Sequence, residues 1–144
     1  MSRYAFVKEA GEKVIDLMTP GSDANEEFSR HLKKVGLSAP DVTAQAEGDT
    51  LYLRGEVATQ EENEKVVLAA GNISGVAGVE DGITVTGPPA QAARFVTVEK
   101  GDTLSSIAKT VYGGADKHNA IFEANKPMLK KPDGIYPGQV LRVV

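Results

Sequence analysis

The sequence predicts an α+β protein of two small domains, and three observations lead to this prediction. Helical and strand-like hydrophobic patterns alternate along 144 residues, a length that suits one ordinary domain or two small ones. The composition is 41% hydrophobic and 25% charged, which is typical of a folded chain. A stretch rich in proline and small residues at 87–93 separates two patterned regions. We therefore expect domains at 1–87 and 95–144, joined by a linker at 88–94.

The composition argues against several classes of protein. The chain has no cysteine, which excludes a disulfide framework, thiol catalysis and cysteine zinc sites. Two histidines are too few for a multi-histidine metal site, and 6% aromatic residues without tryptophan make a poor stacking platform. The formal net charge of -4 argues against a nucleic-acid partner. Charges interrupt every apolar run, so we expect no membrane span, no secretion signal and a cytoplasmic bacterial protein.

The first domain is expected to begin with an added N-terminal helix. Its apolar face follows helical spacing at Phe6, Ala10, Val14, Leu17 and Met18. The polar face carries both charge signs, which favours packing onto the body of the protein over binding to a membrane surface. A second helix is predicted from about Asp23 to Val35, ending at Gly36.

The rest of the first domain reads as two strands, a helix and a strand. Alternating residues predict strands at 42–47 and 50–57, joined by a tight turn. Thr59 and Glu62 form a capping pair that opens the next helix, which must end within 71–75. A strand at 76–85, bent at Asp81–Gly82, completes an α-β-β-α-β unit.

The second domain reads as β-α-α-β. A strand at 95–98 leads through a turn to a helix that buries Leu104, Ile107, Ala108 and Val111 and is capped by Gly113–Gly114. A second helix ends near Asn125, and a turn at 136–139 precedes the closing strand at 140–143.

This second unit closely resembles a LysM domain. The matching stretches are VEKGDTLSSIA at 98–108, IFEANKP at 121–127 and IYPGQVL at 135–141. The resemblance implies a fold that usually binds N-acetylglucosamine polymers such as peptidoglycan. The positions that match the family's sugar groove are Gly101, Asp102, Thr103, Leu104 and Ile135.

The first unit resembles a BON domain, a family often linked to envelope maintenance and phospholipid association. The matches are LRGEV at 53–57, the helix after it and GVAGVED at 75–81. With the N-terminal FVKEAGEK at 6–13 and the LysM unit, the whole chain is similar to the family of bacterial cytoplasmic potassium-binding proteins. GNISG at 71–75 and ANKPMLK at 124–130 are the most distinctive stretches.

That resemblance implies a K⁺ sensor that becomes more compact on binding, and not an enzyme. It places ligand carbonyls at Val7 and Ala10 in the first helix, and at Gly71, Ile73 and Val76 around the end of the third. Neutral carbonyls suit K⁺, and a helix C-terminus offers free carbonyls with partial negative charge. Rb⁺ and Cs⁺ are the expected substitutes. From the residues alone, the same stretch also fits an ordinary helix cap.

Two other functions remain open at this level. One is an envelope module that binds peptidoglycan through the LysM unit, although the lack of a secretion signal makes peptidoglycan an unlikely partner. The other is a pure interaction adaptor. Residues 1–94 carry a net charge of -6 and residues 95–144 a net charge of +2, which predicts intramolecular docking of the BON and LysM units.

No constellation of side chains predicts catalysis. His31 and His118 are expected at the surface, without a neighbouring nucleophile. The acidic residues are expected to be solvated: Asp81 with Glu80 at strand ends, and Glu61, Glu62 and Glu64 as favourable charges in the first turn of a helix.

Overall fold

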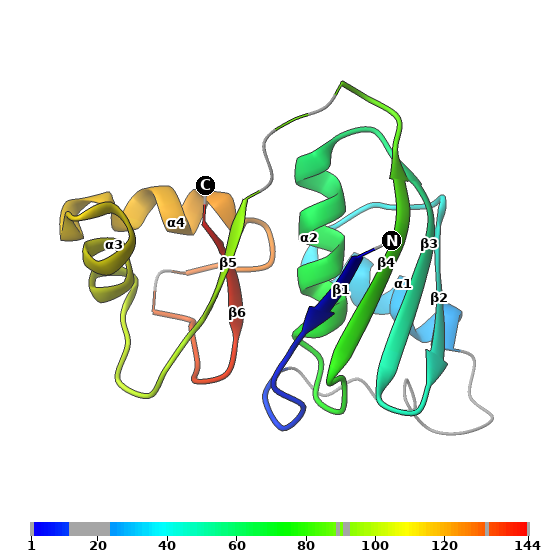
Figure 1. Cartoon of the computed structure of the whole chain (residues 1–144), viewed down its shortest axis with the longest axis horizontal. Coiled ribbons are helices and arrows are strands. Elements are labelled where there is room, and N and C mark those ends of the chain that lie inside the picture. Colours follow the sequence, from blue (N-terminus) through cyan, green and yellow to red (C-terminus); the bar gives the residue numbers. More distant parts are fainter. Residues whose placement is uncertain (1, 12–23, 89, 91–92, 132, 144) are drawn as a thin grey trace.

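The computed structural model of the chain describes residues 2–11, 24–88, 90, 93–131 and 133–143, and it confirms an α+β protein of two domains (Figure 1). The elements of the first domain are β1 (Ser2–Ala5), α1 (Ala24–Val35), β2 (Val42–Glu47), β3 (Thr50–Val57), α2 (Gln60–Gly71) and β4 (Gly78–Val85). Those of the second are β5 (Arg94–Thr97), α3 (Leu104–Tyr112), the short 3₁₀ helix η1 (Ala115–Lys117), α4 (His118–Ala124) and β6 (Val140–Val143).

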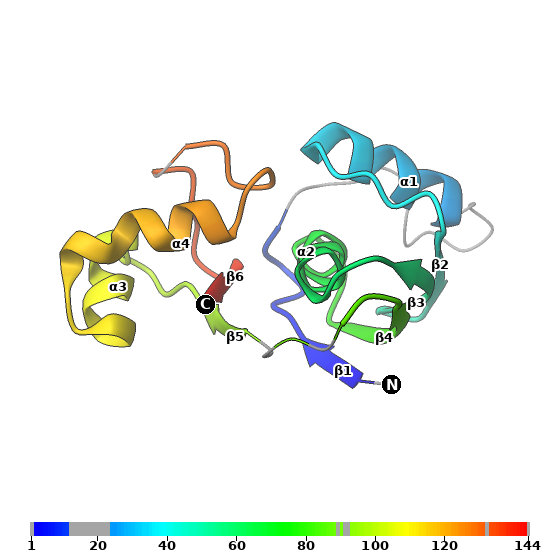
Figure 2. The same ribbon diagram turned by 90° about the horizontal axis from the view of Figure 1, so that it is seen from above.

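A four-stranded sheet in the order β1-β4-β3-β2 organises the first domain. β3 and β4 are parallel and are connected through α2, whereas the β1–β4 and β2–β3 pairs are antiparallel. Both helices cover the same face of the sheet (Figure 2). The core between helices and sheet contains Phe28, Leu32, Leu51, Leu53 and Val79, all at most 3% exposed.

Local signals place most of these elements as predicted. The apolar stripe of α1 is buried, and Gly36 follows the helix with φ of +92°. The β2–β3 hairpin turns at Gly48, whose φ of +64° lies in the left-handed region that glycine tolerates best. Thr59 caps α2, because its hydroxyl accepts a hydrogen bond from the Glu62 N–H at 3.1 Å.

The cap of α2 gives a first testable prediction. Replacing Thr59 by alanine removes the acceptor for the Glu62 N–H, so we expect the free energy of unfolding to fall by about 1 kcal/mol. Urea unfolding measures the change. Thr110→Ala is the control, because the exposed Thr110 hydroxyl donates to the Ser106 carbonyl of its own helix at 3.1 Å and lies in the interior of α3, away from its N-terminus. An equal loss in both variants would contradict a capping role.

The predicted N-terminal helix is wrong over the residues that the structure describes. Residues 2–5 form β1, which pairs with β4 from Arg3↔Glu80 to Ala5↔Gly78, and residues 6–11 form turns. The physical reason is the edge of β4, whose N–H and C=O groups need partners, whereas a short helix gains little by itself. Three residues of the predicted apolar face, Val14, Leu17 and Met18, lie outside the described residues. So does Asp23, where the second helix was predicted to begin.

The predicted bend and solvated charge at Asp81 are also wrong. β4 runs without interruption from Gly78 to Val85, and Asp81 is only 9% exposed. Its Oδ1 accepts hydrogen bonds from Asn63 Nδ2 and from the Ile83 N–H, both at 3.1 Å. Burial of this carboxylate is therefore compensated by two donors.

The second domain packs two helices against the two-stranded antiparallel sheet of β5 and β6. Thr103 and Ser106 form a reciprocal capping box at the start of α3, and Gly113, with φ of +80°, ends this helix. The small core of the second domain contains Leu104, Ile107, Ala108, Ile121 and Leu141. None of the helices in the described ranges has the length and apolar character that a bilayer crossing needs.

Candidate functional site

The candidate site begins where α2 ends. Asn72 is the C-cap residue, with its N–H bonded to the Leu68 carbonyl at 2.9 Å. The chain then turns sharply, and the Val76 N–H donates to the Ile73 carbonyl at 3.1 Å. The side chains of Ile73 and Val76 are fully buried, so they anchor the turn in the core of the first domain. The peptide groups of the turn lie at one end of that domain (Figure 1). We call residues 71–77 the α2–β4 turn.

The N-terminal segment after β1 folds against this turn (Figures 1 and 2). The Phe6 N–H donates to the Ala77 carbonyl at 3.0 Å, and the Gly75 N–H donates to the Lys8 carbonyl at 2.7 Å. The segment also turns on itself, with the Ala10 N–H bonded to the Val7 carbonyl at 3.1 Å. We call residues 6–11 the N-terminal loop.

Two glycines allow the loop and the turn to approach so closely. A Cβ atom on Gly71 would collide with the Phe6 ring. A Cβ atom on Gly11 would lie 2.6 Å from the carbonyl carbon and oxygen of Asn72, and Gly11 has φ of +103°. At Gly11 the contact is therefore between two backbones, and at Gly71 the Phe6 ring lies against the backbone of α2. Neither position has room for a side chain.

The five predicted ligand positions lie on these two segments. Val7 and Ala10 lie on the N-terminal loop, in a turn and not in the helix that was predicted, and Gly71, Ile73 and Val76 lie on the α2–β4 turn. Among the described residues, the Val7 carbonyl accepts from the Ala10 N–H and the Ile73 carbonyl accepts from the Val76 N–H, and a carbonyl oxygen has two lone pairs. Within the described ranges, no backbone N–H donates to the carbonyls of Ala10, Gly71 and Val76.

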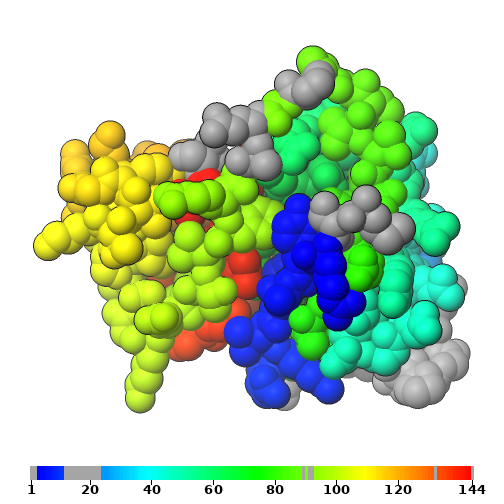
Figure 3. All heavy atoms as spheres, viewed as in Figure 1, coloured from blue at the N-terminus to red at the C-terminus, as the bar shows by residue number. Residues whose placement is uncertain are grey.

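A third segment, from the second domain, reaches the same place. Gly138 follows Pro137 in the turn before β6, with φ of +88°. A Cβ atom on it would lie 2.6 Å from Ala10 Cβ and 3.3 Å from Val7 Cβ. The N-terminal loop thus lies at the junction of the two domains (Figure 3), an arrangement that the local sequence patterns did not predict.

An ion pair joins the two domains beside α2. Arg142 Nε on β6 donates to Glu64 Oε1 at 2.8 Å, and the two side chains are only 9% and 4% exposed. Glu64 Oε2 also accepts from the Ala93 N–H at 2.8 Å. The prediction of Glu64 as a solvated first-turn charge is therefore wrong. One signal was available, because Glu64 precedes the core residue Leu68 by one helical turn on the same face.

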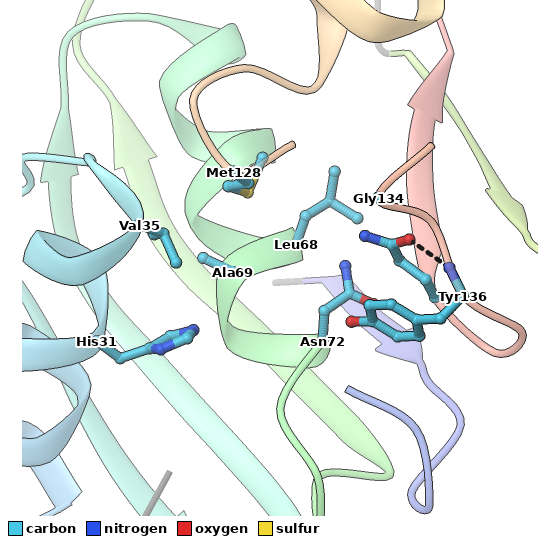
Figure 4. A pocket seen from close by; sticks show the side chains of 9 residues that line it. His31, Val35, Leu68, Ala69, Asn72, Met128, Gly134 and Tyr136 are labelled. Carbon is cyan, nitrogen blue, oxygen red and sulfur yellow. Dashed lines mark hydrogen bonds between the residues drawn. The ribbon is translucent and has the colours of Figure 1, made fainter. Parts of the chain in front are cut away.

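A small pocket of about 80 Å³ lies between the two domains (Figure 4). His31 of α1 lines it from one side, and Asn72 and Tyr136 line it from the other. His31 is only 5% exposed, so the prediction of a surface histidine is wrong there, whereas His118 is half-buried. His31 is enclosed because this face of α1 meets the second domain, which helical periodicity alone cannot show.

The predicted glycan positions have structural roles in the second domain. The Asp102 carboxylate accepts from the Glu99 N–H at 3.0 Å, and the Thr103 hydroxyl caps α3. Leu104 is buried, and Ile135 packs against the same cluster. Gly101 lies in the open, because a Cβ atom there would meet no heavy atom within 4 Å.

Comparison with known proteins finds two domain families in the chain. Residues 22–87 match the BON domain family and residues 96–144 match the LysM domain family. The "Potassium binding protein Kbp" of Escherichia coli O6:H1 is 48% identical over 147 aligned residues, which cover 99% of this chain and 98% of that protein. An "Uncharacterized protein" of Deinococcus radiodurans is 32% identical over 106 residues, covering 67% of this chain and 41% of that protein.

Proposed function

Because the chain belongs to the family of BON–LysM proteins that includes the potassium binding protein Kbp, we propose that it binds K⁺ at the contact between the N-terminal loop and the α2–β4 turn. The ligands would be the backbone carbonyl oxygens of Val7, Ala10, Gly71, Ile73 and Val76. The observation that carries this proposal is the close approach of the two backbones at Gly11 and Asn72, beside the Phe6 ring that packs on Gly71, because it brings together peptide groups from distant parts of the chain.

The chemistry of the two segments suits a monovalent cation. Several neutral carbonyl dipoles can replace the hydration shell of K⁺ without the charge that a divalent ion requires. The C-terminal end of α2 adds the negative pole of a helix dipole. In the part of the chain that the structure describes, no three His, Cys, Asp or Glu side chains lie so that they could hold a metal ion.

Binding would tie together parts of the protein that are far apart in sequence. The N-terminal loop is held to the turn by a small number of hydrogen bonds, from Phe6 to Ala77 and from Gly75 to Lys8. An ion shared by both segments would add bonds across the same contact, and Gly138 of the LysM domain packs against this loop. The bound protein should therefore be more compact and more resistant to unfolding.

A matched salt series tests the proposal. In KCl, RbCl, CsCl, NaCl and LiCl at one ionic strength, we expect K⁺, Rb⁺ and Cs⁺ to raise the melting temperature and to lower the radius of gyration in small-angle scattering. Na⁺ should do so less, because a cage sized for K⁺ cannot close around it without strain, and Li⁺ should not, because it holds its water firmly. A concentration of 100 Kd would stabilise the fold by about 2.7 kcal/mol. Equal effects of Na⁺ and K⁺ would reduce the response to charge screening and contradict the proposal.

A further inference from the structure

The outer edge of β6 is covered by two asparagine side chains. β6 pairs with β5 along one edge only, so peptide groups of Val140 and Arg142 need partners on the other. The Asn125 side chain forms two hydrogen bonds with the main chain of Arg142. The Arg142 N–H donates to Asn125 Oδ1 at 2.8 Å, and Asn125 Nδ2 donates to the Arg142 carbonyl at 2.9 Å. The Asn72 side chain forms the same pair with Val140: the Val140 N–H donates to Asn72 Oδ1, and Asn72 Nδ2 donates to the Val140 carbonyl, both at 2.8 Å.

The two asparagines differ in where they come from. Asn125 follows α4 and belongs to the same domain as β6. Asn72 belongs to the other domain and lies between Gly71 and Ile73, two of the proposed K⁺ ligands. Its main chain contacts Gly11 of the N-terminal loop. One residue therefore has its backbone in the candidate ion site and its side chain on the LysM domain.

We propose that Asn72 is the positioning residue that couples K⁺ occupancy to docking of the LysM domain. This inference rests on the proposed function. An ion bound to the carbonyls on either side of Asn72 fixes the orientation of its main chain, and that orientation aims the amide at Val140. Coupling between two equilibria is reciprocal, so docking at Val140 raises the affinity for K⁺ by the same factor.

The amide group is suited to this role because it has the donor and the acceptor of a peptide group. Asn72 can therefore replace one residue of a neighbouring strand at Val140. Alanine at this position removes both hydrogen bonds. Aspartate keeps an acceptor for the Val140 N–H but places a carboxylate oxygen against the Val140 carbonyl, so it should uncouple the domains at least as strongly.

Hydrogen exchange of the Val140 amide in the full chain tests the coupling. The exchange rate and the chemical shifts of residues 71–76 are followed by NMR through a KCl titration at constant ionic strength. In the unmodified protein, exchange at Val140 should slow with the same midpoint as the shifts of the turn. In Asn72→Ala and Asn72→Asp, K⁺ should still shift the turn, the Val140 rate should no longer depend on K⁺, and the affinity should fall about five- to tenfold.

Asn25→Ala is the matched control. Asn25 also covers a strand edge with its side chain, because its Oδ1 accepts from the Ala44 N–H of β2 at 3.0 Å, but this hydrogen bond lies within the first domain. This variant should keep the K⁺ dependence of the Val140 rate. Should Asn72→Ala not fold, Asn72→Gln keeps the amide but shifts it by one methylene, and the same uncoupling is expected.

Two results would overturn the inference, and they are distinguishable. If a folded Asn72 variant keeps both the K⁺-dependent protection of Val140 and the original affinity, Asn72 is not the coupling residue and the proposed K⁺ site stands. If residues 71–76 of the unmodified protein respond equally to Na⁺ and K⁺, the proposed function fails and the coupling fails with it.

Discussion

Gly71→Ala is expected to weaken K⁺ binding by about tenfold or more. The new methyl group would occupy the space of the Phe6 ring, which must move and take the N-terminal loop with it. Overpacking of this kind costs about 1–3 kcal/mol, and each 1.4 kcal/mol is a factor of ten in affinity. Alanine is a better helix former than glycine, so α2 itself should not suffer. Calorimetric or NMR titration with KCl measures the effect.

Two further variants isolate the cause of that loss. Gly101→Ala introduces the same methyl group in the second domain, where a Cβ atom would meet no heavy atom within 4 Å, and it should leave K⁺ binding unchanged. Combining Phe6→Ala with Gly71→Ala removes the ring that the methyl group meets. Binding in this double variant should recover part of the loss relative to Gly71→Ala alone, because the two changes share one contact. No recovery at all would contradict the steric explanation.

The elements that the sequence predicted correctly depend on neighbours in the chain. The stripe of α1, the tight turn at Gly48 and the cap at Thr59 are each visible within a few residues. The two-domain division is similarly local, because proline and small residues mark the linker. The end of α2 within 71–75 is marked in the same way, by the glycines at 71 and 75.

The elements that were missed depend on distant parts of the chain. β1 forms because β4 offers it an edge, and residues 78–81 are more than seventy positions away. Burial of His31 and Glu64 depends on the position of the LysM domain. The proposed K⁺ site would leave almost no side-chain pattern, because its ligands would be peptide groups. The two glycines at 11 and 71 are its clearest signal, and their meaning needs the contact that the fold creates.

Glu64→Ala is expected to be the most destabilising substitution at the domain junction. It leaves the Arg142 guanidinium, which is only 9% exposed, without the carboxylate that its Nε contacts at 2.8 Å. The Ala93 N–H loses its acceptor in the same change. Removing one partner of a buried ion pair costs about 3–5 kcal/mol in the free energy of unfolding. The contact between the two domains should also loosen, because water would enter to solvate the Arg142 guanidinium. Urea unfolding and small-angle scattering measure the two effects.

The controls for this prediction separate burial from charge. Glu61 is 57% exposed and lies 3.7 Å from Arg142 Nη1, so Glu61→Ala should change the free energy of unfolding by less than about 1 kcal/mol. Replacing both partners, Glu64→Leu with Arg142→Met, removes the two buried charges together and should restore much of the stability. If Glu64→Ala lowers the free energy of unfolding no more than Glu61→Ala does, the Arg142 guanidinium is solvated without a measurable penalty. The ion pair then does not hold the domains together.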